Sequence, residues 1–99
     1  MNVNISSLHF KADQKLQVFI TDKVEKLAKV HDGILAAEVT LKLENTDKLE
    51  KKTAELRLKI RGNDAIAVKT AKTFEEATDE AIDALKKQLS KLKDKERGI

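Results

Sequence analysis

Ala54-Glu55-Leu56-Arg57-Leu58-Lys59-Ile60-Arg61 carries the clearest structural pattern in this 99-residue chain. Its apolar and charged residues alternate without a break, which is the period of a β-strand with one buried face and one wet face. The same alternation runs through residues 38–44 (EVTLKLE), and the polar residues 45–52 between the two stretches predict a hairpin loop. The centre of the fold is therefore a pair of antiparallel strands.

Two more strands flank this hairpin. Gly62-Asn63-Asp64 has the composition of a turn, and it precedes a strand in which we expect Ile66 and Val68 to face the core. At the other end of the chain, Val3 and Ile5 alternate with polar residues and predict the first strand.

Two helices complete the pattern. Apolar residues recur every three or four positions from Leu16, Asp13 can cap the first turn, and Asp32-Gly33 supplies a stop, so a helix is predicted over residues 14–30. Thr73 and Glu76 have the spacing of a capping box and open a longer second helix.

The predicted order is β-α-β-β-β-α, an α+β two-layer sandwich with a four-stranded, mainly antiparallel sheet and both helices on one face. Residues 1–95 should form a single domain and residues 96–99 a frayed tail. The other sheet face should stay in water, and its expected members are Glu38, Thr40, Lys42, Glu55, Arg57, Lys59, Arg61 and Lys69.

Composition excludes several classes of function. The chain has no cysteine and a net charge of +3, with 37% charged residues. No apolar run is long enough for a membrane span, and the first residues lack the pattern of a signal peptide, so we expect a cytoplasmic protein with no membrane partner. It has no glycine-rich phosphate loop and no serine with a base beside it in sequence, so we expect no enzyme activity, no metal and no cofactor.

Charge is divided unevenly along the second helix. Glu75, Glu76, Asp79, Glu80 and Asp83 come first, and Lys86, Lys87, Lys91, Lys93, Lys95 and Arg97 follow. Acids at the start offset the helix dipole, and we interpret the pair Asp79 and Asp83 as a solvated face. The number of cations is larger than one helix end needs to offset its dipole. With Lys23, Lys26 and Lys29 of the first helix they predict a basic patch for a polyphosphate partner, whereas His31 is expected to be a half-buried residue at a helix end.

The chain resembles the ribosome hibernation-promoting factors, a family that includes the ribosome-associated translation inhibitors. The most specific stretch is 83–95 (DALKKQLSKLKDK), which is similar to the closing helix of that family, and supporting stretches are Val3-Asn4-Ile5, residues 23–27 (KVEKL) and residues 39–44 (VTLKLE). The likeness covers essentially the whole chain.

This resemblance implies a protein of the stationary-phase stress response that binds the small ribosomal subunit at the decoding region, blocks mRNA and the tRNA A and P sites, and preserves idle ribosomes. The RNA contacts it implies are Lys23, Lys26, Lys87, Lys91, Lys93 and Lys95, with Lys29 and Lys86 in addition. The end at Ile99 favours the short type of the family, a monomer when free, which supports ribosome dimers with a separate dimerising factor.

Two other readings stay open. A double-stranded RNA-binding module also places two helices on one face of an antiparallel sheet, although it begins with a helix and carries its lysines at the start of its second helix. A protein-interaction domain would use the uncovered sheet face or a sheet edge and would bind with little dependence on salt.

Overall fold

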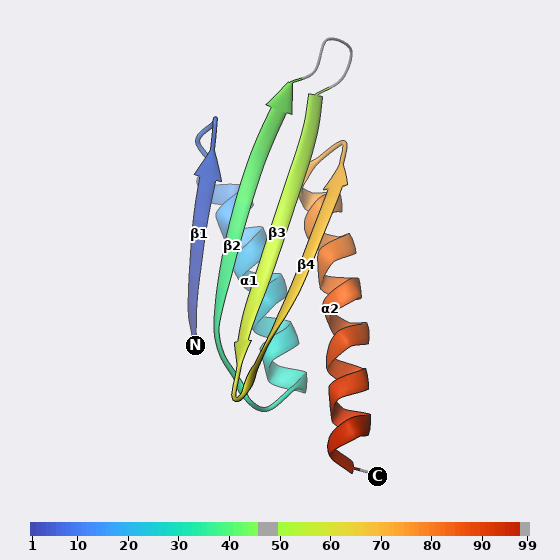
Figure 1. Cartoon of the computed structure of the whole chain (residues 1–99). Helices are drawn as coiled ribbons and strands as arrows, with labels where there is room; N and C mark the ends of the chain where they lie inside the picture. The colour runs from blue at the N-terminus through green and yellow to red at the C-terminus, as the bar shows by residue number, and fades with distance from the viewer. Residues whose placement is uncertain (46–49, 98–99) are drawn as a thin grey trace.

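The computed structural model describes the backbone of residues 1–45 and 50–97 and the side chains of residues 1–44 and 51–91. Its elements are β1 (Asn2–Leu8), α1 (Gln14–Val30), β2 (Ile34–Asn45), β3 (Glu50–Ile60), β4 (Asn63–Ala71) and α2 (Phe74–Arg97). The sheet order is β1-β2-β3-β4, with β1 parallel to β2 and the other pairs antiparallel. Both helices cover the same face of the sheet (Figure 1), which confirms the predicted α+β sandwich.

The helix ends follow the capping residues. The Asp13 carboxylate accepts a hydrogen bond of 2.8 Å from the Leu16 amide, and the Thr73 hydroxyl accepts one of 3.0 Å from the Glu76 amide. Helix α1 spans residues 14–30 as predicted, and the chain then turns through Gly33 at φ +104°, where a side chain would be strained.

Helix α2 is longer than expected. It continues to Arg97 and so includes residues 96 and 97 of the predicted tail, while residues 98 and 99 lie outside the described residues. The physical reason is the composition of this segment, since lysine, glutamate and arginine have high helix propensity without needing a packing partner. The expected loop at 45–52 is also shorter, because strands reach Asn45 and Glu50, and residues 46–49 are not described.

The core lies between the sheet and the two helices. Helix α1 contributes Ile20, Val24 and Leu27, and α2 contributes a line that includes Ala77, Ala81 and Leu85. From the sheet the fully buried leucines and valine are Val39, Leu41, Leu56 and Leu58. These are the apolar sides that the periodicity predicted for both helices and for the two central strands.

The orientation predicted for β4 was wrong. Ala65 and Ala67 face the core at 2% and 6% exposure, whereas Ile66 and Val68 are 41% and 52% exposed on the uncovered face. Both alternations of this strand are apolar, so periodicity alone could not choose between them. Alanine at the inner positions leaves room for α2, which packs against this strand.

Lys69 was also assigned to the wrong face. It pairs with buried Ala54 and shares the side of Ala67, so it lies on the helix-covered face and reaches solvent at the edge strand. Arg61 lies in the turn after β3 instead of in a strand. The other residues predicted for the uncovered face lie in the strands at alternating positions. Three of them form ion pairs, Lys59 with Glu38 at 3.5 Å and Lys42 with Glu44 at 3.3 Å.

The orientation of β4 gives a test by overpacking. We expect Ala67→Leu to lower the free energy of unfolding by about 1–3 kcal/mol, since the added methyl groups must enter a filled core. Val68→Leu, the matched control on the exposed face, should change it by about 0.5 kcal/mol or less. Urea unfolding monitored by circular dichroism measures both. Equal losses for the two variants would contradict this orientation.

Candidate nucleic-acid interface between the two helices

Helices α1 and α2 lie side by side and run in the same direction, and α2 projects beyond the end of α1 (Figure 1). They take these positions because each buries one apolar stripe on the same sheet face. A groove of about 460 Å³ separates their outer sides. It is lined by Lys23, Lys26, Leu27, Val30, Asp79, Ile82, Asp83 and Lys86. The fold thus brings together Lys23, Lys26 and Lys86, three of the predicted RNA contacts.

The two α1 lysines of this groove already have partners within the protein. Lys23 Nζ lies 3.3 Å from Asp79 Oδ1 across the groove and 5.4 Å from the centre of the Phe19 ring. Lys26 Nζ lies 3.3 Å from Asp22 Oδ2 on its own helix. Such exposed pairs contribute little net stability, typically about 0–1 kcal/mol, so a phosphate group can replace the carboxylate at small cost.

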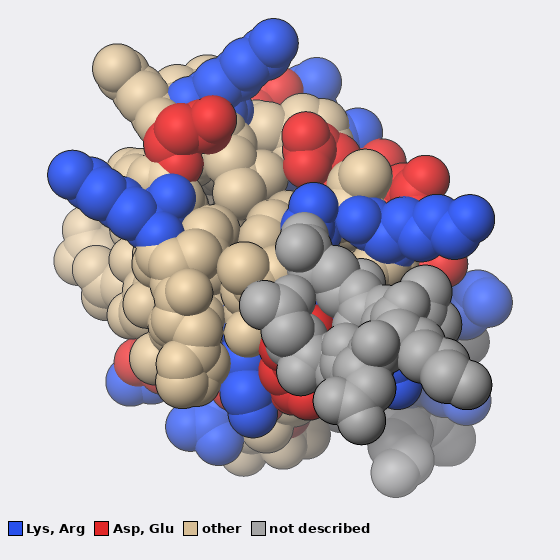
Figure 2. Space-filling view, turned by 90° about the horizontal axis from the view of Figure 1, so that it is seen from above, with Lys and Arg blue, Asp and Glu red and all other residues tan. Residues whose placement is uncertain are grey.

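The acidic half of α2 has a role that the sequence did not reveal. Asp79 and Asp83 are exposed, which confirms the interpretation as a solvated face, and the structure also places both in the groove beside the lysines of α1. No sequence signal gives the register of one helix against another, so this pairing could not be predicted. The carboxylates make the groove mixed in charge. Figure 2 shows the same mixture at the end of the molecule where α2 begins, with acidic and basic side chains next to each other.

Three further predicted contacts have described side chains, and these lie outside the groove. Lys29, Lys87 and Lys91 are exposed on their helices, and none of them lines either hollow between α1 and α2. Lys93 and Lys95 lie in the last turns of α2, and their side chains are outside the described part. In sequence, the lysines of α2 are concentrated in its C-terminal half.

No helix among the described residues is long and apolar enough to cross a membrane.

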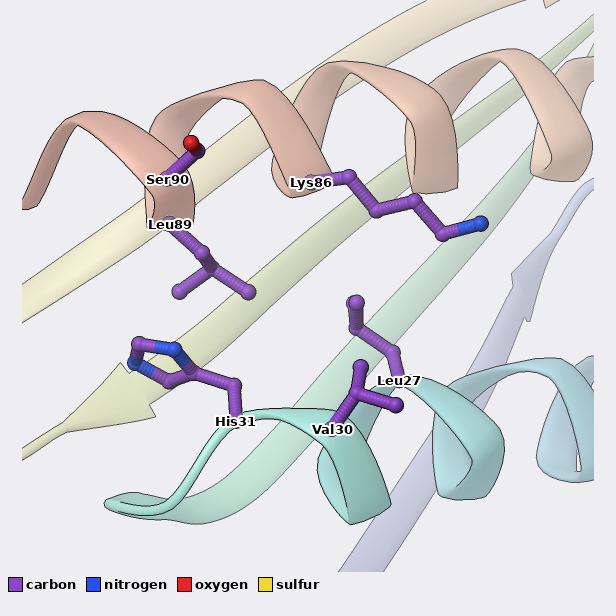
Figure 3. A pocket seen from close by; sticks show the side chains of 6 residues that line it. All are labelled: Leu27, Val30, His31, Lys86, Leu89 and Ser90. Carbon is purple, nitrogen blue, oxygen red and sulfur yellow. The ribbon is translucent and has the colours of Figure 1, made fainter. Parts of the chain in front are cut away.

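A second hollow of about 260 Å³ continues the groove toward the end of α1. It is lined by Leu27, Val30, His31, Lys86, Leu89 and Ser90 (Figure 3). His31 follows α1 directly and is half-buried, as predicted. Sequence reasoning missed the hollow because its walls come from two helices far apart in the chain.

The residues of this hollow favour ligand binding over catalysis. Ser90 and His31 line it together, which places an imidazole nearer to this serine than the sequence indicated. Figure 3 shows the Leu89 side chain between the two, and among the described residues no hydrogen bond joins them. An apolar floor beside a lysine suits a ligand with apolar and anionic parts.

Comparison with known proteins adds independent findings. The family model described as sigma 54 modulation protein / S30EA ribosomal protein matches residues 3–97. A ribosome hibernation promoting factor of Pseudomonas putida is 31% identical over 99 residues, which cover 100% of this chain and 93% of the relative.

Solved structures share the fold. A ribosomal subunit interface protein from Coxiella burnetii aligns with a TM-score of 0.82 at 20% identity, over 94% of this chain and 98% of that one. The N-terminal domain of Thermus thermophilus Protein Y aligns with a TM-score of 0.80 at 22% identity, over 93% of this chain and 99% of that one.

Proposed function

This chain belongs to the sigma 54 modulation protein / S30EA ribosomal protein family, a family of ribosome hibernation factors, and on that premise we propose how it acts. It binds the small ribosomal subunit at the decoding region through α1 and the basic half of α2. There it occupies the space of mRNA and of tRNA in the A and P sites, so that an idle ribosome stays inactive and preserved.

The observation that carries this proposal is the exposed basic surface on the C-terminal half of α2. Lys86, Lys87 and Lys91 are all exposed there, and after Asp83 the described helix holds few acids. A row of cations along one helix matches the negative charge of an RNA backbone. Lys23 and Lys26 extend this basic surface onto α1 across the groove.

The mechanism is occlusion by shape and charge. Phosphates displace the carboxylates from exposed lysine pairs and release counterions, so binding draws its free energy largely from electrostatics. No covalent step is needed, since a bound protein of this size blocks other ligands by occupying their place. The exposed position of these lysines lets them contact RNA without any change in the core.

Sedimentation through sucrose gradients with purified bacterial ribosomes tests the proposal. We expect the protein to migrate with the small subunit at low salt and to be lost at high salt. If about five lysines neutralise phosphates, the logarithm of the binding constant should fall by several units per unit of log salt. A slope near zero, or no comigration at either salt concentration, would contradict the proposal.

The two other readings have less support. A double-stranded RNA-binding module would need cations at the start of its second helix, and here Glu75 and Glu76 occupy the first turn of α2. A protein-interaction domain would use the uncovered sheet face, where Ile66 and Val68 are exposed but pair with the charged Arg57 and Glu55. Binding to a protein partner without salt dependence would favour that reading.

The partners and the cellular location of the protein follow from its binding to ribosomes. Ribosomal RNA of the small subunit is the ligand, the free protein is a monomer, and the protein works in the cytoplasm where ribosomes are. A separate factor would be needed to pair ribosomes into dimers, because the basic helices supply one RNA-binding surface and are occupied by the first ribosome.

A further inference from the structure

The hollow between the end of α1 and the middle of α2 has an apolar floor and a polar rim. Leu27 and Leu89 are 2% and 4% exposed and form the floor. The rim is formed by Ser90, His31 and the Lys86 side chain. In Figure 3 the His31 ring points toward Leu89, and the Lys86 side chain extends along the groove away from Ser90.

Val30 forms one side of this hollow although it is 73% exposed. A ligand that covers this apolar side chain and the apolar floor beside it removes apolar surface from water, which favours binding. Lys86 is the one charged residue among those that line the hollow, so its charge favours an anionic ligand. The ligand that fits therefore has an apolar part and a negative group next to it.

The dipole of α1 favours entry of the apolar part of the ligand over its anionic part. The hollow lies at the C-terminal end of α1, which carries partial negative charge and disfavours a phosphate. A nucleobase suits the place better, because its faces are apolar and its edge bears N–H donors. Single-stranded RNA is commonly recognised through unstacked bases whose edges form hydrogen bonds to the protein.

We propose that this hollow receives one unstacked base of the ribosomal RNA, with Lys86 on the adjacent phosphate and Ser90 and His31 at the base edge. The inference rests on the proposed function and adds a contact that does not depend on salt. The lysines around it supply electrostatic attraction, whereas the inserted base anchors the protein in one register on the RNA.

Filling the hollow from within tests the proposal. Ser90→Leu places an apolar side chain where the base would lie, and Ser90 is exposed, so the fold should be kept. We expect binding to small ribosomal subunits to weaken about tenfold at every salt concentration, the loss expected when a hydrogen-bonded base contact is removed. The slope of log affinity against log salt should stay unchanged. Ser6→Leu, the same substitution on the uncovered sheet face, is the matched control and should bind as wild type.

Two further variants separate the apolar contact with the base from the electrostatic contact with the phosphate. Val30→Ser should weaken binding at every salt concentration without changing the slope, whereas Lys86→Gln should reduce the slope by about one unit. If wild type binds and Ser90→Leu binds equally well, or if Ser90→Leu alters the slope, the inference is overturned and the proposed function stands. If wild type itself fails to bind small subunits, the proposed function is overturned together with the inference.

Discussion

Double charge reversal at Lys87 and Lys91 is expected to abolish comigration with the small ribosomal subunit. Lys87→Glu with Lys91→Glu lowers the net charge by four units on the exposed side of α2, and each glutamate would repel a phosphate where the lysine attracted one. Both side chains are exposed, so each substitution should change the free energy of unfolding by about 0.5 kcal/mol or less. Sedimentation at low salt and thermal unfolding measure the two effects.

The control keeps the net charge change and moves it to the other end of the molecule. Lys11→Glu with Lys72→Glu alters two exposed residues that lie just before α1 and just before α2, far from the last turns of α2. This variant should retain most ribosome binding. An equal loss in both double variants would mean that only net charge matters. Unfolding of the Lys87/Lys91 variant would assign these lysines to stability.

Leu85→Ala is expected to have the largest effect on stability. Leu85 is fully buried at 0% exposure, on the face of α2 that packs against the sheet. Removing its methyl groups leaves a cavity, and such substitutions lower the free energy of unfolding by about 2–5 kcal/mol. Urea unfolding at equilibrium gives this value directly.

Ile66→Ala provides the comparison for this loss. The residue is also a large aliphatic, but it is 41% exposed on the uncovered face of β4. Its loss should therefore be well below that of Leu85→Ala, because water already contacts the side chain. A nearly neutral Leu85→Ala would contradict the helix register, and a costly Ile66→Ala would contradict the orientation of β4.

Most of the fold could be predicted because local rules agree with the tertiary structure. Asp13 and Thr73 cap the two helices as their side chains suggest, and the alternation in β2 and β3 gives the buried face directly. In these segments one face is clearly apolar and the other clearly polar, so burial has one solution. The lysines of the candidate site were predicted from the charge pattern of the two helices and from the family resemblance, and their contact with RNA stays a prediction.

Local sequence patterns specify the order of elements, the helix limits at the caps, the apolar sides of α1 and α2, and the separation of acids from bases along α2. Three features depend on tertiary packing: the buried face of β4, the contact of Asp79 with Lys23 across the groove, and the hollow that Leu27, Val30 and Leu89 enclose with Ser90. The two sets of features differ in the sequence separation of the residues that determine them. Periodicity and capping act between residues a few positions apart, whereas the approach of one helix to another depends on how side chains distant in sequence fill the space between them.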